Sequence, residues 1–347
     1  MAQMQSEVLS YSAPMRSTHS FTDKKHMHRY YILLGTLVLL GILSALGLLL
    51  YNNPVPVTSP SFIPVTRRRM ISVVTMFIAA VCQSLATVSF QTATNNRIIT
   101  PSLLGFEALY SAIHTSTIFF FGLQSLLEFK GVNAFIIQMI IMVGFSLILY
   151  GWLLSGKYGN MQLMLLVGVV LGTGLKSLSA FMRRLLNPSE FDILQARLFG
   201  SVNNADVDNF VVAIPLMLIT ASLLIINSKK LNLLSLGREV CINLGFNHRR
   251  GTIFILFLVS ILMSISTALV GPLTFYGFLV ATLSYQLAPT YDHRYIFPMS
   301  LALGFLILTS SYFIMYHVFN AQGVVSIIIE LFGGMAFMAL ILRKGSL

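Results

Sequence analysis

Charged residues are scarce in this sequence. They make up 10% of the 347 residues, whereas hydrophobic residues make up 56%. A soluble globular protein usually has about 25% charged residues, which help to cover its surface with groups that water solvates. The chain therefore has too few charges for a water-facing surface, and we expect most of it to lie in a lipid bilayer.

Cysteine is also rare, with only Cys82 and Cys241 present. Two cysteines exclude a disulfide-stapled scaffold, and neither has the spacing of a metal site. We interpret both as ordinary apolar residues. The sequence therefore predicts no metal site and no cofactor.

A phosphate-binding loop is absent as well. The segment from Gly151 to Lys157 has P-loop spacing, but Tyr158 stands where Ser or Thr would bind magnesium. The segment also follows an apolar helix, whereas a P-loop needs a buried strand before it. We predict that the chain has no catalytic residues and does not hydrolyse ATP by this route.

Acidic residues are half as frequent as basic ones, 11 against 22, which gives a formal net charge of +11. Such an excess could indicate a nucleic-acid-binding protein. In a membrane protein it more often reflects basic cytoplasmic loops that face anionic lipid. We therefore expect membrane lipid as a partner and no nucleic acid.

Long uncharged runs fill most of the chain. About 20 apolar residues cross the hydrocarbon as a helix, and lipid cannot satisfy a free backbone amide. Gly271-Pro272 divides one long run into two, because proline removes a hydrogen-bond donor. The sequence predicts an all-α, polytopic membrane protein with about ten transmembrane helices. We expect these helices near residues 30–51, 70–93, 103–122, 132–154, 161–181, 208–227, 252–270, 273–287, 296–316 and 324–342.

Lysine and arginine predict the orientation. With the N-terminus inside, the inner segments hold fourteen of these residues and the outer segments seven, as the positive-inside rule favours. Residues 1–29 are then a basic cytoplasmic tail, and residues 30–342 form the transmembrane domain. Residues 229–250 form a cytoplasmic loop, and residues 343–347 a cytoplasmic C-terminus.

The cytoplasmic loop contains two short apolar stretches, each closed by a glycine. The stretch 231–236 ends at Gly237, and the stretch 240–244 ends at Gly245; glycine is the usual helix stop. Two short helices with exposed leucines could dock into a groove on a cytoplasmic partner. They could equally lie on the lipid surface, and the residues alone leave both interpretations open.

The connection after the second predicted helix is unusually polar. Gln83, Gln91, Asn95 and Asn96 could line a wet pathway, because polar groups inside a membrane tend to face a cavity. They could equally form hydrogen bonds between helices or cap a helix end.

Glu107 and Glu330 each lie a few residues inside a predicted helix. A carboxylate within the membrane is a functional candidate, and a secondary transporter driven by an ion gradient would use one to bind a proton or sodium. Both lie near helix N-termini, where a negative charge is favourable in any case. With no partner visible in the sequence, the structural interpretation is favoured.

Three adjacent arginines, Arg67, Arg68 and Arg69, break the positive-inside trend on the predicted outer side. Arginine can hold a carboxylate through two parallel hydrogen bonds, so the cluster could be an electrostatic docking site. The alternative is a helix cap.

Four segments carry a resemblance to a known family. They are SFQTATNNRIITPSLLGFEALY (89–110), NPSEFDILQARLFGSVNN (187–204), LNLLSLGREVCINLGFN (231–247) and ALVGPLTFYGFLVA (268–281). Together they resemble the FecCD-type permeases of ABC importers for iron-siderophores, haem and vitamin B12. The second segment is similar to the branch of siderophore permeases found in Gram-positive bacteria.

The resemblance implies ten spans in a type II ABC importer permease architecture, in the bacterial cytoplasmic membrane. It implies four partners: ABC ATPase subunits, a second permease subunit (a sister chain or a copy of this one), an extracytoplasmic substrate-binding protein and a ferric siderophore. Haem or vitamin B12 as cargo, and transport driven by an ion gradient, are the alternatives.

The resemblance also implies roles for particular residues. ATPase coupling falls to the paired loop segments and to Leu236, Gly237, Arg238, Glu239, Leu244 and Gly245. Docking of the binding protein falls to Arg67, Arg68 and Arg69. The translocation path is expected beside the second helix, at Gln83, Gln91, Asn95 and Asn96.

Overall fold

A computed structural model describes residues 20, 21, 23–51, 60, 62–155, 161–319 and 325–344. Over these residues the chain forms α-helices joined by short 3-10 helices and turns, and no strand. The helices are α1 Lys24–Leu50, α2 Phe62–Ala93, α3 Phe106–Glu128, α4 Gly131–Ser155, α5 Met161–Arg184, α6 Pro188–Leu198, α7 Phe210–Ile226, α8 Ser228–Leu234, α9 Arg238–Asn243, α10 His248–Val270, α11 Tyr276–Leu287, α12 His293–His317 and α13 Val325–Lys344. Most of the predicted tail 1–29 and part of the C-terminus 343–347 lie outside the described residues.

Seven segments of the described chain are long and apolar enough to cross a membrane: α1, α2, α4, α5, α7 with the turn before it, α10 and α12. The other three predicted spans coincide with α3, α11 and α13. Of these, α11 has only 12 residues, which span about 18 Å at 1.5 Å per residue. Helix α3 is interrupted at Gly122, whose φ is +80°.

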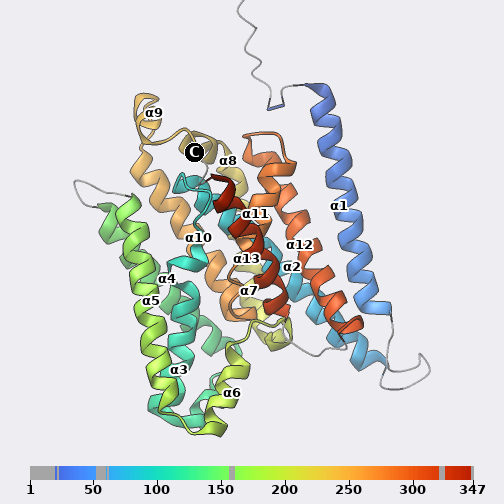
Figure 1. Ribbon diagram of the computed structural model, residues 1–347, viewed down its shortest axis with the longest axis vertical. Coiled ribbons are helices and arrows are strands. Elements are labelled where there is room, and N and C mark those ends of the chain that lie inside the picture. Colours follow the sequence, from blue (N-terminus) through green and yellow to red (C-terminus); the bar gives the residue numbers. More distant parts are fainter. Residues whose placement is uncertain are drawn as a thin grey trace, which may run out of the picture.

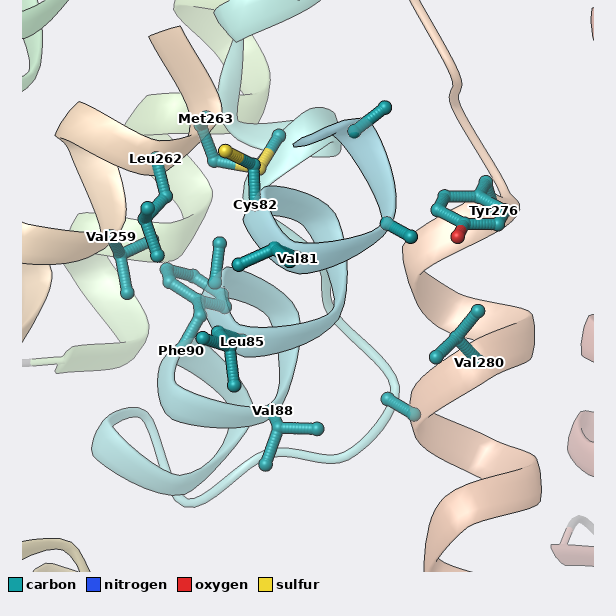
Figure 2. Packing of buried hydrophobic residues seen from close by; sticks show 14 of the residues in the cluster. Val81, Cys82, Leu85, Val88, Phe90, Val259, Leu262, Met263, Tyr276 and Val280 are labelled. Carbon is teal, nitrogen blue, oxygen red and sulfur yellow. The ribbon is translucent and has the colours of Figure 1, made fainter. Parts of the chain in front are cut away.

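Helices α2 and α10 form the centre of the bundle, and both are mostly buried, whereas α1 and α5 are largely exposed. Figure 2 shows α2 between α10 on one side and α11 on the other, with Cys82 and Leu85 facing the neighbouring helices. Small side chains permit this close approach, as in other membrane helices. At Gly304 of α12, for example, an added Cβ would lie 2.4 Å from the Ser84 hydroxyl oxygen.

The break between α10 and α11 falls at Gly271, whose φ is +91°. The segment after α6 crosses this point, and the Ser201 N–H donates to the Val270 carbonyl at 2.7 Å. A Cβ on Gly200 would lie 2.1 Å from the Pro272 carbonyl oxygen, so only glycine fits at this crossing. The short helix α11 therefore starts from a rigid turn inside the bundle.

The two ends of the bundle differ. Figure 1 shows α8, α9 and the start of α1 at one end, and α6 at the other. The loop 229–250 therefore lies on the same side as the N-terminal end of α1. The assignment of this side to the cytoplasm stays a prediction.

Candidate functional site

An apolar surface rimmed by bases lies at the end of the bundle that holds α8 and α9. Leu244 is 61% exposed and Leu236 is 52% exposed, and the neighbouring Val240 and Ile242 are also exposed. Around them, the exposed charged side chains are Arg238, Glu239, Arg249 and Arg250. An exposed apolar patch with a polar rim is typical of a protein or membrane interaction site.

The opposite face of the loop is fixed to the bundle. Leu231 and Leu234 of α8 are fully buried. The Cys241 thiol of α9 donates to the Leu233 carbonyl at 2.9 Å, and burial raises the pKa of this thiol, which favours the protonated form that donates. Helix α9 begins after Gly237, whose φ is +88°. The loop is thus a stiff unit with an exposed apolar tip.

A cavity of about 1140 Å³ separates this loop from the end of α2. Asn95 and Asn96 line it together with Gly237, Arg238 and Gly245. A Cβ on Gly237 would lie only 3.7 Å from Asn95 Nδ2. The structure thus places two of the four residues predicted for the path next to residues predicted for ATPase coupling.

The other two, Gln83 and Gln91, lie inside α2 and are each 1% exposed. Gln91 Nε2 donates to the Arg97 carbonyl at 2.8 Å and so stabilises the turn after α2. Gln83 faces α11, because a Cβ on Gly277 would lie 3.5 Å from Gln83 Oε1. In this conformation Gln83 belongs to the interface with α11 and Gln91 to the turn after α2, and neither lines the cavity beside the loop or the one beside Arg68.

The three arginines lie on α2 at the opposite end from the loop, and they divide into two groups. Arg69 Nη1 donates to the carbonyls of Leu48, Leu49 and Tyr51, at 3.2, 3.2 and 3.1 Å. These carbonyls end α1 and have no partner within the helix, so Arg69 is a cap of α1. Arg67 and Arg68 are exposed.

Arg68 borders a second cavity, of about 550 Å³, at the same end. Asn203, Tyr316 and His317 share its lining, and Asn203 Nδ2 donates to the Tyr316 hydroxyl at 2.7 Å. Arg69 also borders this cavity, and Arg67 does not. The exposed arginines are Arg67 and Arg68, whereas Arg69 is bonded to the end of α1.

The two carboxylates that looked isolated in the sequence share a partner. The Thr274 hydroxyl donates to Glu107 Oε2 at 2.7 Å and lies 3.4 Å from Glu330 Oε1. The charge of Lys176 on α5 acts on both carboxylates. Sequence reasoning missed Thr274 and Lys176, and the only signal was the break at Gly271-Pro272 just before the threonine. Among the described residues, no three His, Cys, Asp or Glu side chains gather as a metal site would require.

Known proteins resemble this chain in sequence and in fold. The model of the FecCD transport family matches residues 28–343. The chain is 65% identical over 332 residues to the petrobactin import system permease protein FatC of Bacillus anthracis, covering 96% of this chain and 94% of FatC. It is 38% identical to the petrobactin import system permease protein YclO of Bacillus subtilis, covering 80% of this chain and 88% of YclO.

A solved structure shares the fold. It is an inward-facing conformation of a metal-chelate type ABC transporter, with a TM-score of 0.76 and 19% identity, covering 90% of this chain and 99% of that one. This match confirms the predicted all-α fold of the chain. The family and the relatives confirm the predictions of a multi-pass membrane permease of an ABC import system and of a chain that is not an ATPase. With the family model covering nearly the whole sequence, the chain belongs to the FecCD transport family.

Proposed function

We propose that this chain is the permease subunit of an ATP-driven importer that carries ferric petrobactin, a siderophore complex, across the cytoplasmic membrane. The observation that carries the proposal is the 65% identity to FatC across 96% of the chain. YclO, at 38% identity, is also a petrobactin import system permease protein. The partners would be ABC ATPase subunits, a second permease subunit and an extracytoplasmic substrate-binding protein.

The apolar tip of α8 and α9 is the proposed contact with the ATPase subunits. Leu236 and Leu244 supply its exposed apolar area, and Gly237 and Gly245 set its shape through their positive φ angles. A stiff loop suits this role, because a deformable one would absorb the movement that ATP binding imposes. If that movement reaches the long helices, the translocation path would open alternately to the two sides of the membrane.

The translocation path is proposed along the exposed side of α5. Lys176 is exposed there, and its positive charge interacts with the carboxyl groups of Glu107 and Glu330. Charged groups inside a membrane usually face the bundle interior or a water-filled cavity, so lipid is an unfavourable neighbour for this face. A second permease subunit would cover it and enclose the path. Asn95 and Asn96 would then border its cytoplasmic end, and Gln83 and Gln91 would reach the path only if α2 moved against α11.

Growth assays test the cargo. Deleting the gene is expected to abolish growth on ferric petrobactin under iron limitation, while growth on haem or on abundant free iron persists. Restoring the gene on a plasmid should restore growth. Loss of haem or vitamin B12 use with intact petrobactin use would contradict the assignment. Uptake that resists vanadate but stops with an uncoupler would instead favour an ion-gradient-driven transporter using Glu107 or Glu330.

Binding-protein docking is proposed for the exposed arginines of α2. Arg67→Glu with Arg68→Glu is expected to weaken binding of the loaded binding protein by about tenfold, chiefly through a slower association rate, because rim charges steer encounter. The effect should shrink as salt rises. Biosensor measurements on the permease complex in nanodiscs, at low and physiological salt, check both points.

The matched control is Lys130→Glu with Arg184→Glu, two exposed bases that the orientation also places outside. It changes the net charge by the same amount at other positions. Equal weakening by both pairs would contradict a local docking site. Arg69 is left unchanged, because its loss would disturb the end of α1.

A further inference from the structure

A chain of hydrogen bonds joins the loop to two long helices at the end of the bundle that holds α8. Asn232 of α8 stands at its centre. Its Nδ2 donates to Asp292 Oδ1 at 2.9 Å, and its Oδ1 accepts from the His293 backbone N–H at 3.0 Å. Oδ1 also contacts His293 Nδ1. One side chain of the loop thus holds the first residues of α12.

The series of hydrogen bonds continues from α12 to α2. His293 Nε2 lies 2.7 Å from the Thr92 hydroxyl oxygen, in the last turn of α2. The three other residues in this series of hydrogen bonds are largely buried: His293 is 2% exposed, Thr92 is 7% and Asp292 is 8%. In a site with so little water, a broken hydrogen bond leaves a polar group without a replacement partner. The contacts therefore resist being pulled apart.

The donors and acceptors define one arrangement. Partial burial alone would raise the pKa of Asp292, but hydrogen bonds from Asn232, Arg294 and Ser20 lower it, so the carboxylate is ionised and only accepts. The Asn232 amide must then direct its NH₂ group to Asp292 and its oxygen to His293. That oxygen cannot donate, so the proton of this contact is on His293 Nδ1. In the neutral ring, Nε2 carries no proton and can only accept. The Thr92 hydroxyl proton is therefore shared between His293 Nε2 and the Val88 carbonyl of its own helix, which lies 2.9 Å from the hydroxyl oxygen.

Helix capping does not account for these contacts. Asp292 already caps α12 by accepting from the Arg294 N–H at 3.1 Å, and that bond needs no other helix. The bonds of Asn232 and Thr92 add connections to α8 and α2. The apolar side chains buried beneath α8, Leu231 and Leu234, can slide against their neighbours, whereas hydrogen bonds fix direction and register.

We propose that Asn232, His293 and Thr92 form a mechanical joint, through which displacement of the loop by the ATPase subunits moves α12 and α2 together. This inference rests on the proposed function, because the ATPase subunits supply the displacement. The joint is a positioning device: its residues contact one another and transmit movement. Its loss should uncouple ATP hydrolysis from transport without preventing assembly.

The test uses two neighbouring threonines of α2. Thr92→Val removes the hydroxyl that meets His293 and keeps the side-chain shape. Thr94→Val is the matched control, because both threonine hydroxyls bond to carbonyls of their own helix, Thr92 to Val88 and Thr94 to Phe90 and Gln91. Of the two, only the Thr92 hydroxyl also meets another helix. The measured quantity is the ferric petrobactin imported per ATP hydrolysed, by the complete transporter in proteoliposomes with its binding protein.

Thr92→Val is expected to lower this ratio by about threefold and Asn232→Leu by about tenfold, the larger change removing more hydrogen bonds. Thr94→Val should leave the ratio unchanged. ATP hydrolysis and ATPase subunit binding should persist in all three variants. Because Thr92 and Asn232 act through the same histidine, the double variant should be no worse than Asn232→Leu alone.

A ratio unchanged by Thr92→Val, or lowered equally by Thr94→Val, would overturn the joint, even if Asn232→Leu fails to fold. A wild-type complex that imports without hydrolysing ATP would instead overturn the proposed function. The two failures are distinguishable, because the first appears only in the comparison of variants and the second in the wild type.

Discussion

Replacing Gly237 with valine is expected to abolish uptake while the chain still inserts into the membrane. Gly237 has φ +88° and ψ 168°, a conformation that residues with a Cβ rarely adopt. Holding a non-glycine residue in such a region costs about 1–3 kcal/mol, and a β-branched side chain is among the least tolerant. The space around the position is open, since a Cβ would approach only Asn95 Nδ2, at 3.7 Å.

The strain therefore falls on the backbone that sets the angle between α8 and α9. Relaxing it would turn α9 and displace Leu244 relative to Leu236, so the apolar tip would no longer fit its partner. We expect uptake to fall by about a hundredfold, as the loss of an interface anchor of about 3 kcal/mol would produce. Whole-cell uptake of ferric petrobactin and co-purification of the ATPase subunits are the measurements.

Gly144→Val in α4 is the matched control. This glycine lies inside a helix, and an added Cβ would meet nothing within 4 Å. Uptake by this variant should be close to that of the wild type. If Gly237→Val still binds ATPase subunits and stimulates ATP hydrolysis in response to the binding protein, the loop is not the coupling element.

Replacing Lys176 with methionine is expected to have the second largest effect. Lys176 supplies the positive charge that acts on Glu107 and Glu330, and the two carboxylates share the single hydroxyl of Thr274. Without the ammonium group, any ionised carboxylate of this pair would lie inside the membrane without that opposite charge, which is unfavourable. We expect uptake to fall by about tenfold or more, together with the amount of inserted protein.

A compensating change makes this prediction specific. Lys176→Met combined with Glu107→Gln returns the cluster to its original net charge, and it should recover part of the lost uptake. Ser177→Met, at the neighbouring exposed position of α5, is the control for added apolar bulk and should have little effect. Full uptake by Lys176→Met, or no recovery by the double variant at normal expression, would contradict a role for the Lys176 charge in this cluster.

The sequence by itself determined the class of protein and most of its helices. Scarce charge and long uncharged runs are local properties, and the bilayer converts them into spanning helices because it satisfies no backbone hydrogen bonds. The glycines of the loop 229–250 were also visible, because each closes a short apolar stretch: Gly237 precedes α9 and Gly245 follows it. The break at Gly271-Pro272 was visible for the same reason, as proline and glycine act on their immediate neighbours.

The helix ends were less well predicted, because charge alone did not mark them. The second helix was expected to start at residue 70, but α2 begins at Phe62, so the three arginines lie within a helix and not before one. Arg67 and Arg68 are exposed to solvent and Arg69 bonds to the end of α1, so none of the three opposes helix formation. The interruption of α3 at Gly122 was not expected either, since a single glycine within an apolar run is often helical.

Only the tertiary structure decided which polar groups meet. Thr274 reaches Glu107 across 167 positions of sequence, and Thr92 reaches His293 across 201. Arg69 caps a helix that ends 19 residues before it, and no local pattern separates it from the exposed Arg68. Side-chain direction depends on how each helix is rotated against its neighbours, and that rotation is set by packing over the whole bundle. Hydrophobicity places the helices in the membrane, and their packing places Asn232 against the first residues of α12.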